Sequence, residues 1–453
     1  MRRTITIFAL LACICAGAQE SLSLKECLEM CGSNNPEVRN SRLDVLSSQA
    51  LKSELTWEYF PTVSLGGISY YAGSPLLRIG LKDILGTSDM AWELNNRITA
   101  FTNENGIRNH YDLMGWGYGV SLIATQPVYA GGRIRSGNRL ARLGIEAADL
   151  QADIKLRDTR LETERKYWRV VALQEKMTTL RKAKSVIDSL YARLCSARDA
   201  GLALESDVAQ VRSRRTELLS GEIALKGGMK LAKMDLFNSI GLKYEYLKLD
   251  DYILTEAIGE PVSPDKLLGG ETSDPTELRL LDAQVEARKL EKKVSIGEYL
   301  PEVALGASYG YGNLVGRSNT DPGSKAIGFA TVKIPLTGIG KAVTRARRYD
   351  YEIQKAMNEK EWYDSQLVLQ RRQLFLAAET AFSQAGVARE ALMDARDRER
   401  RCRAEYQAGR TTISELLQAE LASRTAAEDY IDRCIDYRLA VSDYTGRYGS
   451  PAE

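Results

Sequence analysis

The stretch EYLPEVALGASYGYGN, residues 298–313, alternates apolar with small residues inside a chain that is otherwise rich in charged, helix-favouring residues. Successive side chains of an extended strand point to opposite faces. Here one face is apolar and aromatic and the other mostly small or polar, namely Val303, Leu305, Ala307, Tyr309 and Tyr311 against Glu302, Ala304, Gly306, Ser308 and Gly310. About ten residues of this composition are typical of a transmembrane β-strand. A strand of a soluble sandwich, the alternative, would carry larger residues on its inner face.

The same pattern occurs earlier in the chain, in EYFPTVSLGGISYYAG at residues 58–73, where seven of sixteen positions are identical. A further alternating segment follows each of these two stretches. The sequence therefore predicts four membrane strands, at about 61–73, 115–127, 301–313 and 325–336. In the last of them Lys333 falls where a lipid-facing residue is expected. We expect a β-bulge or the membrane boundary at that point.

Two long intervals of the chain, 128–260 and 336–450, contain no proline. Proline in a helix interior costs about 3 kcal/mol. Both intervals are rich in Ala, Leu, Arg, Glu, Gln and Lys, which favour helix. We predict a long helical hairpin in each, over about 131–243 and 339–448.

A single glycine turn marks the tip of each predicted hairpin, at Gly201 in ARDAGLALESDVAQV and at Gly409 in EYQAGRTTISELLQA. Glycine adopts the positive φ with which a chain reverses after a helix. Thr412 and Glu415 stand three residues apart directly after the second turn, which is the spacing of a capping box. We expect the second hairpin to restart there.

The two halves of the chain align without gaps over more than eighty residues. Pairs at a constant offset of 208 include Pro127/Pro335, Gly132/Gly340, Gly201/Gly409, Ser206/Ser414 and Gln210/Gln418. We therefore predict an internal duplication, with a first repeat over 19–243, a linker over 244–272 and a second repeat over 273–450. The first repeat carries 32 extra residues between its strands, a loop-like insertion from about Ser74 to Asp112.

The first eighteen residues read as a secretion signal. Arg2 and Arg3 precede the apolar run ITIFALLACICAG, and small residues stand before Gln19. The apolar run is too short to span a bilayer as a helix. A lipoprotein signal ending before Cys13 is the alternative. With either signal the chain leaves the cytoplasm.

Charge and side-chain chemistry exclude several classes of function. From Gln19 onward, 60 Lys and Arg balance 60 Asp and Glu, which argues against a nucleic-acid binder. His110 is the only histidine, so histidine-based catalytic triads and multi-histidine metal sites are excluded. Cys27 and Cys31, one helical turn apart, are either a pair of soft-metal ligands or two small residues on a helix face. We expect neither an enzyme nor a cofactor.

Four strands cannot close a membrane barrel, since the smallest known barrels have eight. Open strand edges are not tolerated in lipid. The chain must therefore share one barrel with symmetry-related copies of itself. Two copies would make an eight-stranded barrel filled by its own side chains, whereas three copies would make twelve strands around a bore. The sequence thus favours a homotrimer.

At this point the sequence resembles the TolC-type family of outer-membrane efflux proteins. The resemblance covers nearly all of the chain after the signal and rests on the strand entries at Pro61 and Pro301, the strand exits QPVYAGGR (126–133) and IPLTGIGK (334–341), and the two tip motifs. It implies a mixed α+β membrane protein, in which a twelve-stranded trimeric barrel in the outer membrane continues into a coiled-coil helical tunnel crossing the periplasm. It also implies a periplasmic adaptor, which docks at the hairpin tips Gly201 and Gly409, and an inner-membrane transporter as partners.

The resemblance also implies a constriction at the periplasmic entrance. The family places an Asp six residues after the first tip glycine, where this chain has Asp207, and a Tyr three residues before the second, where it has Tyr406. An Arg is expected two residues after the second glycine, but Thr411 stands there, with Arg410 next to it.

Acidic rings are expected six and nine residues after the second glycine, at Glu415, which matches, and Gln418, which does not. Because Gln418 removes a fixed negative charge, strong cation binding at the entrance is not expected. A solvated helical surface is the alternative interpretation of all these polar residues.

The function that follows is a passive exit duct, the outer-membrane channel subunit of a tripartite efflux or type I secretion system. A periplasmic coiled-coil adaptor or a structural envelope scaffold is the alternative. An adaptor would have a single hairpin flanked on both sides by a β-rich lipoyl-like module, and a scaffold would leave the strands unexplained. The transported cargo cannot be read from the chain, because the transporter selects it.

Overall fold

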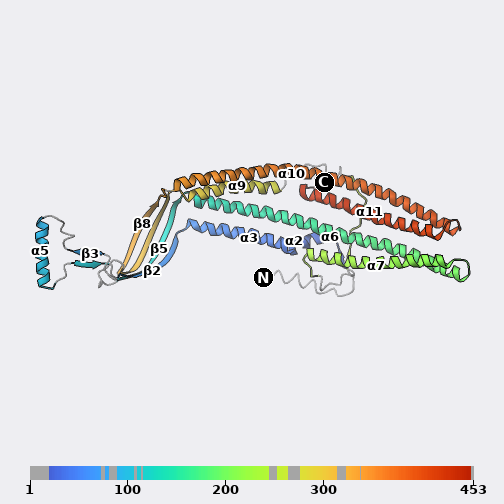
Figure 1. Cartoon of the computed structure of the whole chain (residues 1–453), viewed down its shortest axis with the longest axis horizontal. Coiled ribbons are helices and arrows are strands. Elements are labelled where there is room, and N and C mark those ends of the chain that lie inside the picture. The colour runs from blue at the N-terminus through green and yellow to red at the C-terminus, as the bar shows by residue number, and fades with distance from the viewer. Residues whose placement is uncertain are drawn as a thin grey trace. The chain divides into compact units, whose positions relative to one another are not determined.

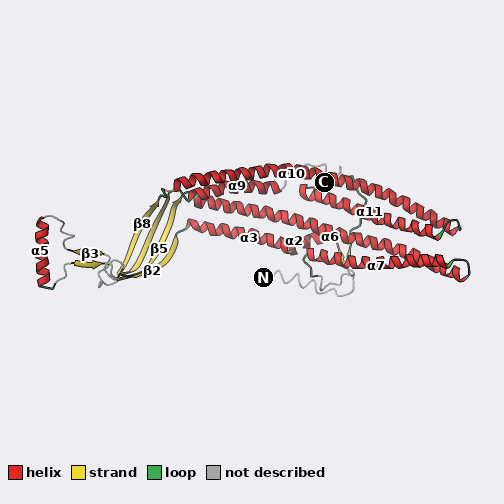
Figure 2. Cartoon of the chain, viewed as in Figure 1, coloured by secondary structure: helices red, strands yellow, loops and turns green. Residues whose placement is uncertain are grey.

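The computed structural model of the chain describes residues 20–72, 77–80, 89–106, 110–113, 116–243, 252–263, 276–313, 323–336 and 338–449. The predicted signal peptide, Cys13 and parts of the predicted insertion and linker lie outside these residues. Within them, long helices dominate and a small set of strands accompanies them (Figure 1, Figure 2).

The four strands and the two long hairpins occur where the alternation and the proline-free intervals predict them. The insertion that was expected to be loop-like instead contains two short strands, at 77–80 and 110–113, and a helix at 89–104, and the short strands at 20–22 and 252–254 were not predicted. The strands are β1 (Glu20–Leu22), β2 (Thr62–Tyr71), β3 (Leu77–Gly80), β4 (His110–Leu113), β5 (Trp116–Ala130), β6 (Tyr252–Leu254), β7 (Glu302–Asn313) and β8 (Gly323–Lys333). The helices are α2 (Leu24–Asn34), α3 (Pro36–Thr56), η1 (Trp57–Tyr59), α5 (Asp89–Glu104), α6 (Arg133–Asp199), α7 (Glu205–Ser239), α9 (Thr276–Gly297), α10 (Gly338–Gln407) and α11 (Ile413–Tyr448).

The chain divides into two compact units, each built from separate stretches of sequence. The helical unit comprises residues up to Ser47, Glu146–Gln284 and Met357 onward. The sheet unit comprises Ser48–Ile145 and Val285–Ala356.

A four-stranded antiparallel sheet forms the centre of the sheet unit, in the order β2-β5-β7-β8. β5 runs three residues past the predicted end because the ladder absorbs Pro127, which has no N–H to donate, through a register shift between Pro127 and Tyr129. Among the described strands, β2 and β8 each have a neighbour on one side only. The sheet therefore presents two open edges.

The register assigns each strand's side chains to the two faces of the sheet. Leu305 and Tyr309, on the predicted apolar face of β7, are exposed. On the opposite face, the Phe329 ring covers Gly306, where an added Cβ would lie 2.2 Å from the ring. Lys333 pairs with Glu302 and so shares the face of the small residues. The expected bulge at Lys333 is wrong, because the β7–β8 register runs without a shift and Lys333 is simply the last residue of β8.

The exit of β5 packs closely against the end of α9. Gly131 has φ +61°, and a Cβ added there would lie 2.3 Å from the Gly297 carbonyl oxygen. Gly132, the next residue, also has positive φ (+75°) but faces open space. Of these two glycines, Gly131 alone combines left-handed backbone with a backbone contact that leaves no room for a side chain.

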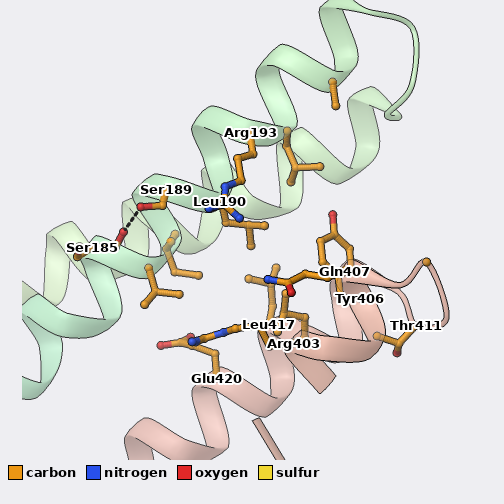
Figure 3. Close-up of a pocket in the computed structure, with 16 residues that line it drawn as sticks. Ser185, Ser189, Leu190, Arg193, Arg403, Tyr406, Gln407, Thr411, Leu417 and Glu420 are labelled. Carbon is orange, nitrogen blue, oxygen red and sulfur yellow. Dashed lines mark hydrogen bonds between the residues drawn. The ribbon is translucent and has the colours of Figure 1, made fainter. Parts of the chain in front are cut away.

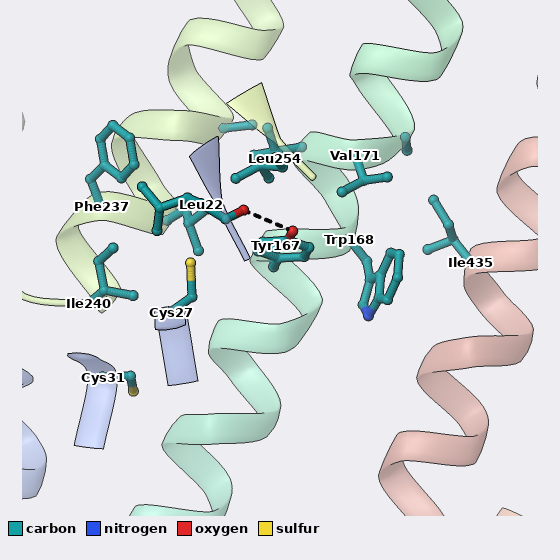
Figure 4. Close-up of a cluster of buried hydrophobic side chains, with 14 residues drawn as sticks. Leu22, Cys27, Cys31, Tyr167, Trp168, Val171, Phe237, Ile240, Leu254 and Ile435 are labelled. Atoms are coloured by element: carbon teal, nitrogen blue, oxygen red, sulfur yellow. Dashed lines mark hydrogen bonds between the residues drawn. The ribbon is translucent and has the colours of Figure 1, made fainter. Parts of the chain in front are cut away.

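The main hydrophobic core of the helical unit surrounds Tyr167 and Phe237, on α6 and α7 (Figure 4). The Tyr167 hydroxyl donates a hydrogen bond of 3.1 Å to the carbonyl oxygen of Leu22 in β1. β1 pairs in parallel with β6, so this core ties the first described strand to the segment after α7. Leu22 and Leu254 complete it from the two strands.

Cys27 and Cys31 on α2 are fully buried in the same core (Figure 4). Burial, with Glu26 and Cys31 adding, raises the pKa of the Cys27 thiol to about 12, so it stays protonated at neutral pH. Thr163 donates a hydrogen bond to the Cys31 sulfur at 3.2 Å. Within the described residues no cluster of three metal-ligating side chains occurs. Both cysteines pack as part of the hydrophobic core.

None of the described helices is both long and apolar enough to cross a membrane.

The close packing at Gly131 generates a stability prediction. Alanine at Gly131 or at Gly132 costs about 1–2 kcal/mol for the left-handed backbone. Gly131→Ala adds the clash with Gly297, which we expect to cost about 1–3 kcal/mol more. Thermal unfolding of the assembled protein, followed by circular dichroism, should show a clearly lower midpoint for Gly131→Ala than for the matched control Gly132→Ala. Equal midpoints for the two variants would mean that the close contact between Gly131 and Gly297 does not contribute to stability.

Candidate functional site at the hairpin tips

Both hairpins reverse through the same hydrogen-bond arrangement. At the first tip the N–H groups of Gly201 and Leu202 donate to the carbonyl oxygens of Arg198 and Ala197, both at 2.8 Å. At the second tip, Gly409 and Arg410 donate to Tyr406 at 3.0 Å and Glu405 at 2.8 Å. These paired bonds are the Schellman motif, which requires the left-handed residue that glycine provides. Gly201 and Gly409 have φ +75° and +70°.

Helix α11 begins after the second tip with an N-cap but without the full capping box that was predicted. The Thr412 hydroxyl accepts a hydrogen bond of 3.3 Å from the Glu415 N–H, as a helix N-cap does. The Glu415 carboxylate does not close the box, because it accepts a hydrogen bond from the Thr411 hydroxyl instead. Thr411 stands where the resemblance implies an arginine, and its hydroxyl is hydrogen-bonded to the Glu415 carboxylate.

Asp207 and Tyr406 lie on different hairpins, in the first turn of α7 and the last turn of α10. Tyr406 is half-buried, and its pKa is raised, first by burial and then by the negative charge of Asp207. The two side chains therefore influence each other electrostatically. Among the hydrogen bonds of the described residues, however, none joins the Tyr406 hydroxyl to the Asp207 carboxylate.

The remaining predicted entrance residues face solvent. Arg410, Glu415 and Gln418 are all exposed. Arg410 contributes its backbone N–H to the tip, and its side chain forms no ion pair with any described carboxylate. Single-chain geometry thus brings Asp207 towards Tyr406 and leaves the other three at the surface.

A cluster of buried apolar side chains holds the two tips together. Val208 and Val211 from α7 meet Ile413 and Leu416 from α11 in this cluster, and Tyr406 packs against it. Equivalent turns of the two hairpins therefore share one small core.

A groove of about 620 Å³ opens between α6 and the second tip (Figure 3). Ser185, Ser189 and Arg193 line it from α6, while Tyr406 and Glu420 line it from the second hairpin. Apolar residues of the shared core complete its floor. The groove therefore combines an apolar floor with charged and hydroxyl groups at its rim.

A buried ion pair behind the tips was not predicted from the sequence. Arg214 on α7 donates from Nε and Nη2 to Glu420 Oε2 on α11, at 3.1 and 3.0 Å. Their side chains are only 9% and 6% exposed. Glu420 Oε1 has no hydrogen-bond partner among the described groups.

A sequence signal for this pair exists. Ile413, Leu416, Glu420 and Ser423 are all buried and follow the 3-4-3 spacing of a coiled-coil seam, so Glu420 is a charge in a core position. Arg214 occupies the corresponding place between Val211 and Leu218. A charge of each sign at core positions of two neighbouring helices indicates a buried pair.

Two long helical hairpins attached to a four-stranded antiparallel sheet are the fold of outer-membrane efflux channels. No protein-family model matches the sequence, and no curated protein matches it. Solved structures do. The chain shares 14% identity and a TM-score of 0.69 with the Campylobacter jejuni CmeC outer membrane channel, over 95% of this chain and 87% of that one.

Two further solved structures of outer-membrane proteins share this fold. The Vibrio cholerae outer membrane protein VceC gives 13% identity and a TM-score of 0.67 over 94% and 96% of the two chains. The open state of the Neisseria gonorrhoeae MtrE outer membrane channel gives 14% and 0.68 over 93% and 88%. The resemblance of the sequence to the TolC-type family is confirmed at the level of the fold.

The buried ion pair predicts an asymmetric mutational response. Glu420→Leu strands the Arg214 charge in a buried site and should cost about 3–5 kcal/mol. Arg214→Met with Glu420→Leu removes both charges and should recover most of that loss. Glu217→Gln is the matched control, since the exposed Glu217 also pairs with Arg214, at 2.9 Å, and such a pair is worth at most about 1 kcal/mol. Thermal unfolding midpoints of the four proteins provide the test. A double variant as unstable as Glu420→Leu would contradict the assignment.

Proposed function

We propose that the chain is a subunit of an outer-membrane channel, a passive exit duct serving a tripartite efflux or type I secretion system. The main evidence for this proposal is the four-stranded sheet, whose strands are joined at one end to two long helical hairpins. The fold shared with outer-membrane channels over more than nine-tenths of the chain supports the proposal. The proposed location is the outer membrane, with the hairpins in the periplasm.

The open edges of β2 and β8 support a homotrimer. In lipid, the backbone N–H and C=O groups of an edge strand find no water, so each edge needs another strand. Pairing β8 of one copy with β2 of the next would satisfy both edges, and three copies would give a twelve-stranded barrel with a bore. The internal duplication fits this arrangement, since each half supplies two strands and one hairpin. A detergent-solubilised complex with the mass of one or two chains would contradict it.

The hairpin tips are the proposed docking surface for a periplasmic adaptor, which would connect the duct to an inner-membrane transporter. Leu202 and Leu204 beside the first tip are 84% and 68% exposed, and exposed leucines at a turn favour a protein partner. Gly201 and Gly409 leave open space where a side chain would stand. A Gly409→Trp variant that assembles and still exports normally would argue against docking at that tip.

The entrance is proposed to constrict around Asp207 and Tyr406 until a pump engages. No hydrogen bond joins these two side chains within the described part of the single chain, so one would have to form in the closed assembly, where a partly buried hydrogen bond to a charged group is worth about 1.5–3 kcal/mol. Three copies around a symmetry axis would then favour the closed state by several kcal/mol. Arg410 would supply the positive charge that Thr411 lacks, and Glu415 with Gln418 would line the mouth.

Single-channel conductance in planar bilayers tests the duct and its constriction together. We expect the wild-type protein to add discrete conductance steps, and the Asp207→Ala, Tyr406→Phe variant to give larger ones. Glu361→Ala with Tyr363→Phe removes the same chemical groups from α10, far along the chain from the tip, and should leave the conductance unchanged. No steps from any variant would contradict the channel, whereas equal steps from wild type and double variant would place the constriction elsewhere.

The alternative functions fit the observations less well. A periplasmic adaptor would carry one hairpin and a β-rich module on both flanks, whereas the described part of this chain has two hairpins, each preceded by two strands of one four-stranded sheet. An envelope scaffold gives no reason for an exposed apolar sheet face. The cargo is set by the transporter, and the genes beside this one would indicate its class.

A further inference from the structure

Taken together, the helical segments that adjoin the strands of the sheet unit are basic, and most of the excess positive charge lies in residues 133–145 and 338–356. Residues 48–59, 133–145, 285–298 and 338–356 contain 14 Lys and Arg against seven Asp and Glu. The chain from Gln19 onward is neutral as a whole, so the rest of it carries a compensating negative charge. We refer to these four segments as the basic collar. Two of these segments precede β2 and β7 and the other two follow β5 and β8. Because neighbouring strands are antiparallel, all four segments join the sheet at one end.

A shallow, open pocket of about 460 Å³ lies within the collar at the start of α10. Lys341, Arg345 and Arg348 line it at i, i+4 and i+7, and so lie on one helix face. Tyr299 and Thr344 also line the pocket, and the Arg345 guanidinium lies 5.2 Å from the centre of the Tyr299 ring. The pocket thus combines three cations with an aromatic wall.

The carboxylates around the pocket neutralise only part of this charge. Glu298 pairs with Arg345 at 2.6 Å, and Glu352 pairs with Arg348 at 3.5 Å. Asp350 pairs outside the pocket with Lys292, at 2.5 Å. Lys341 is exposed and has no carboxylate partner among the described residues. The pocket therefore retains a net positive charge.

The first repeat carries a similar row at the start of α6. Arg135, Arg139 and Arg142 have the same i, i+4, i+7 spacing and are all exposed. In the described part of the chain, none of the three forms an ion pair. Two helices that leave the sheet thus each present a row of cations within their first three turns.

Exposed aromatic residues accompany these cations. Trp57 and Phe60, directly before β2, are exposed, and their rings lie 5.3 Å apart. Aromatic residues at the ends of membrane strands are typical of the headgroup level of a bilayer. Basic residues beside aromatic ones at the end of a membrane sheet match a lipid headgroup region rather than a protein-binding surface.

We propose that the basic collar binds the phosphate groups of anionic phospholipids in the leaflet that faces the helical hairpins. This inference rests on the proposed membrane function, because it places the four strand ends at the bilayer surface. Lys341 and Arg348 bind the headgroup phosphate in the α10 pocket, and the α6 row binds a second headgroup. Arginine suits this role because its planar fork matches the oxygens of a phosphate.

Lipid retention by the full-length protein tests the inference. The assembled wild type is placed in nanodiscs of phosphatidylethanolamine with either phosphatidylglycerol or phosphatidylcholine, re-extracted, and analysed by native mass spectrometry. We expect bound phosphatidylglycerol to exceed bound phosphatidylcholine. Lys341→Gln with Arg348→Gln should lower phosphatidylglycerol retention by about tenfold. Arg169→Gln with Arg372→Gln, which removes two exposed charges from the helical unit, is the matched control and should not change it.

Each other outcome has a defined meaning. Equal retention of the two lipids, or an unchanged value in Lys341→Gln with Arg348→Gln, would overturn the inference. Complete displacement of phosphatidylglycerol by inorganic phosphate would also overturn it, since the site would then be one for free phosphate. The charge-retaining exchange Lys341→Arg with Arg348→Lys should keep the lipid, which separates loss of binding from loss of folding. Failure of the wild type to enter either nanodisc would contradict the proposed function itself.

Discussion

The open edges of β2 and β8 are the constraint on which the rest of this structure depends. In the described chain each edge strand is paired on one side only, so a row of backbone N–H and C=O groups is left without a strand partner. In water such an edge is an aggregation hazard, and in lipid it is prohibitive. The apolar face of the sheet is better suited to lipid than to water, because large apolar and aromatic residues such as Leu305 and Tyr309 are exposed on it. Sharing one barrel among copies answers both problems at once.

Two of the long helices, α6 and α10, begin where strands of this sheet end. Each strand passes into a helix within a few residues, so the ends of the sheet set where α6 and α10 begin, and the absence of proline lets both continue for 67 and 70 residues. The hairpins reverse at Gly201 and Gly409 through identical hydrogen bonds and share one apolar cluster. Behind that cluster, Arg214 and Glu420 form a buried pair that favours one register of α7 against α11, because a shifted register would separate the buried Glu420 carboxylate from Arg214.

Local patterns in the sequence were enough to predict the four strands of the sheet and the two hairpins, whereas they did not predict the helix and two short strands of the insertion or the contacts between distant residues. Alternation locates the strands, and glycine between proline-free intervals locates the tips, because both are properties of a few consecutive residues. The face of Lys333 was misassigned because it depends on pairing with Glu302 in another strand. Arg214 and Glu420 lie 206 positions apart, and their contact follows from the packing of two hairpins. At the second tip, the Glu415 carboxylate accepts a hydrogen bond from the Thr411 hydroxyl and does not close the capping box, and the spacing of the residues alone does not decide between these two bonds.

The central claim is that β8 of one copy pairs with β2 of the next, and cysteine cross-linking between these edges tests it most directly. Ala330→Cys on β8 would be combined in turn with Val63→Cys, Leu65→Cys or Gly67→Cys on β2, all on the apolar face by the observed register. Two cysteines form a disulfide only when their Cα atoms lie within about 7 Å. The account predicts that at least one pair of introduced cysteines gives covalent trimers on non-reducing gels. A variant that carries only one introduced cysteine beside the native ones should not. Cross-links confined to single chains would contradict it.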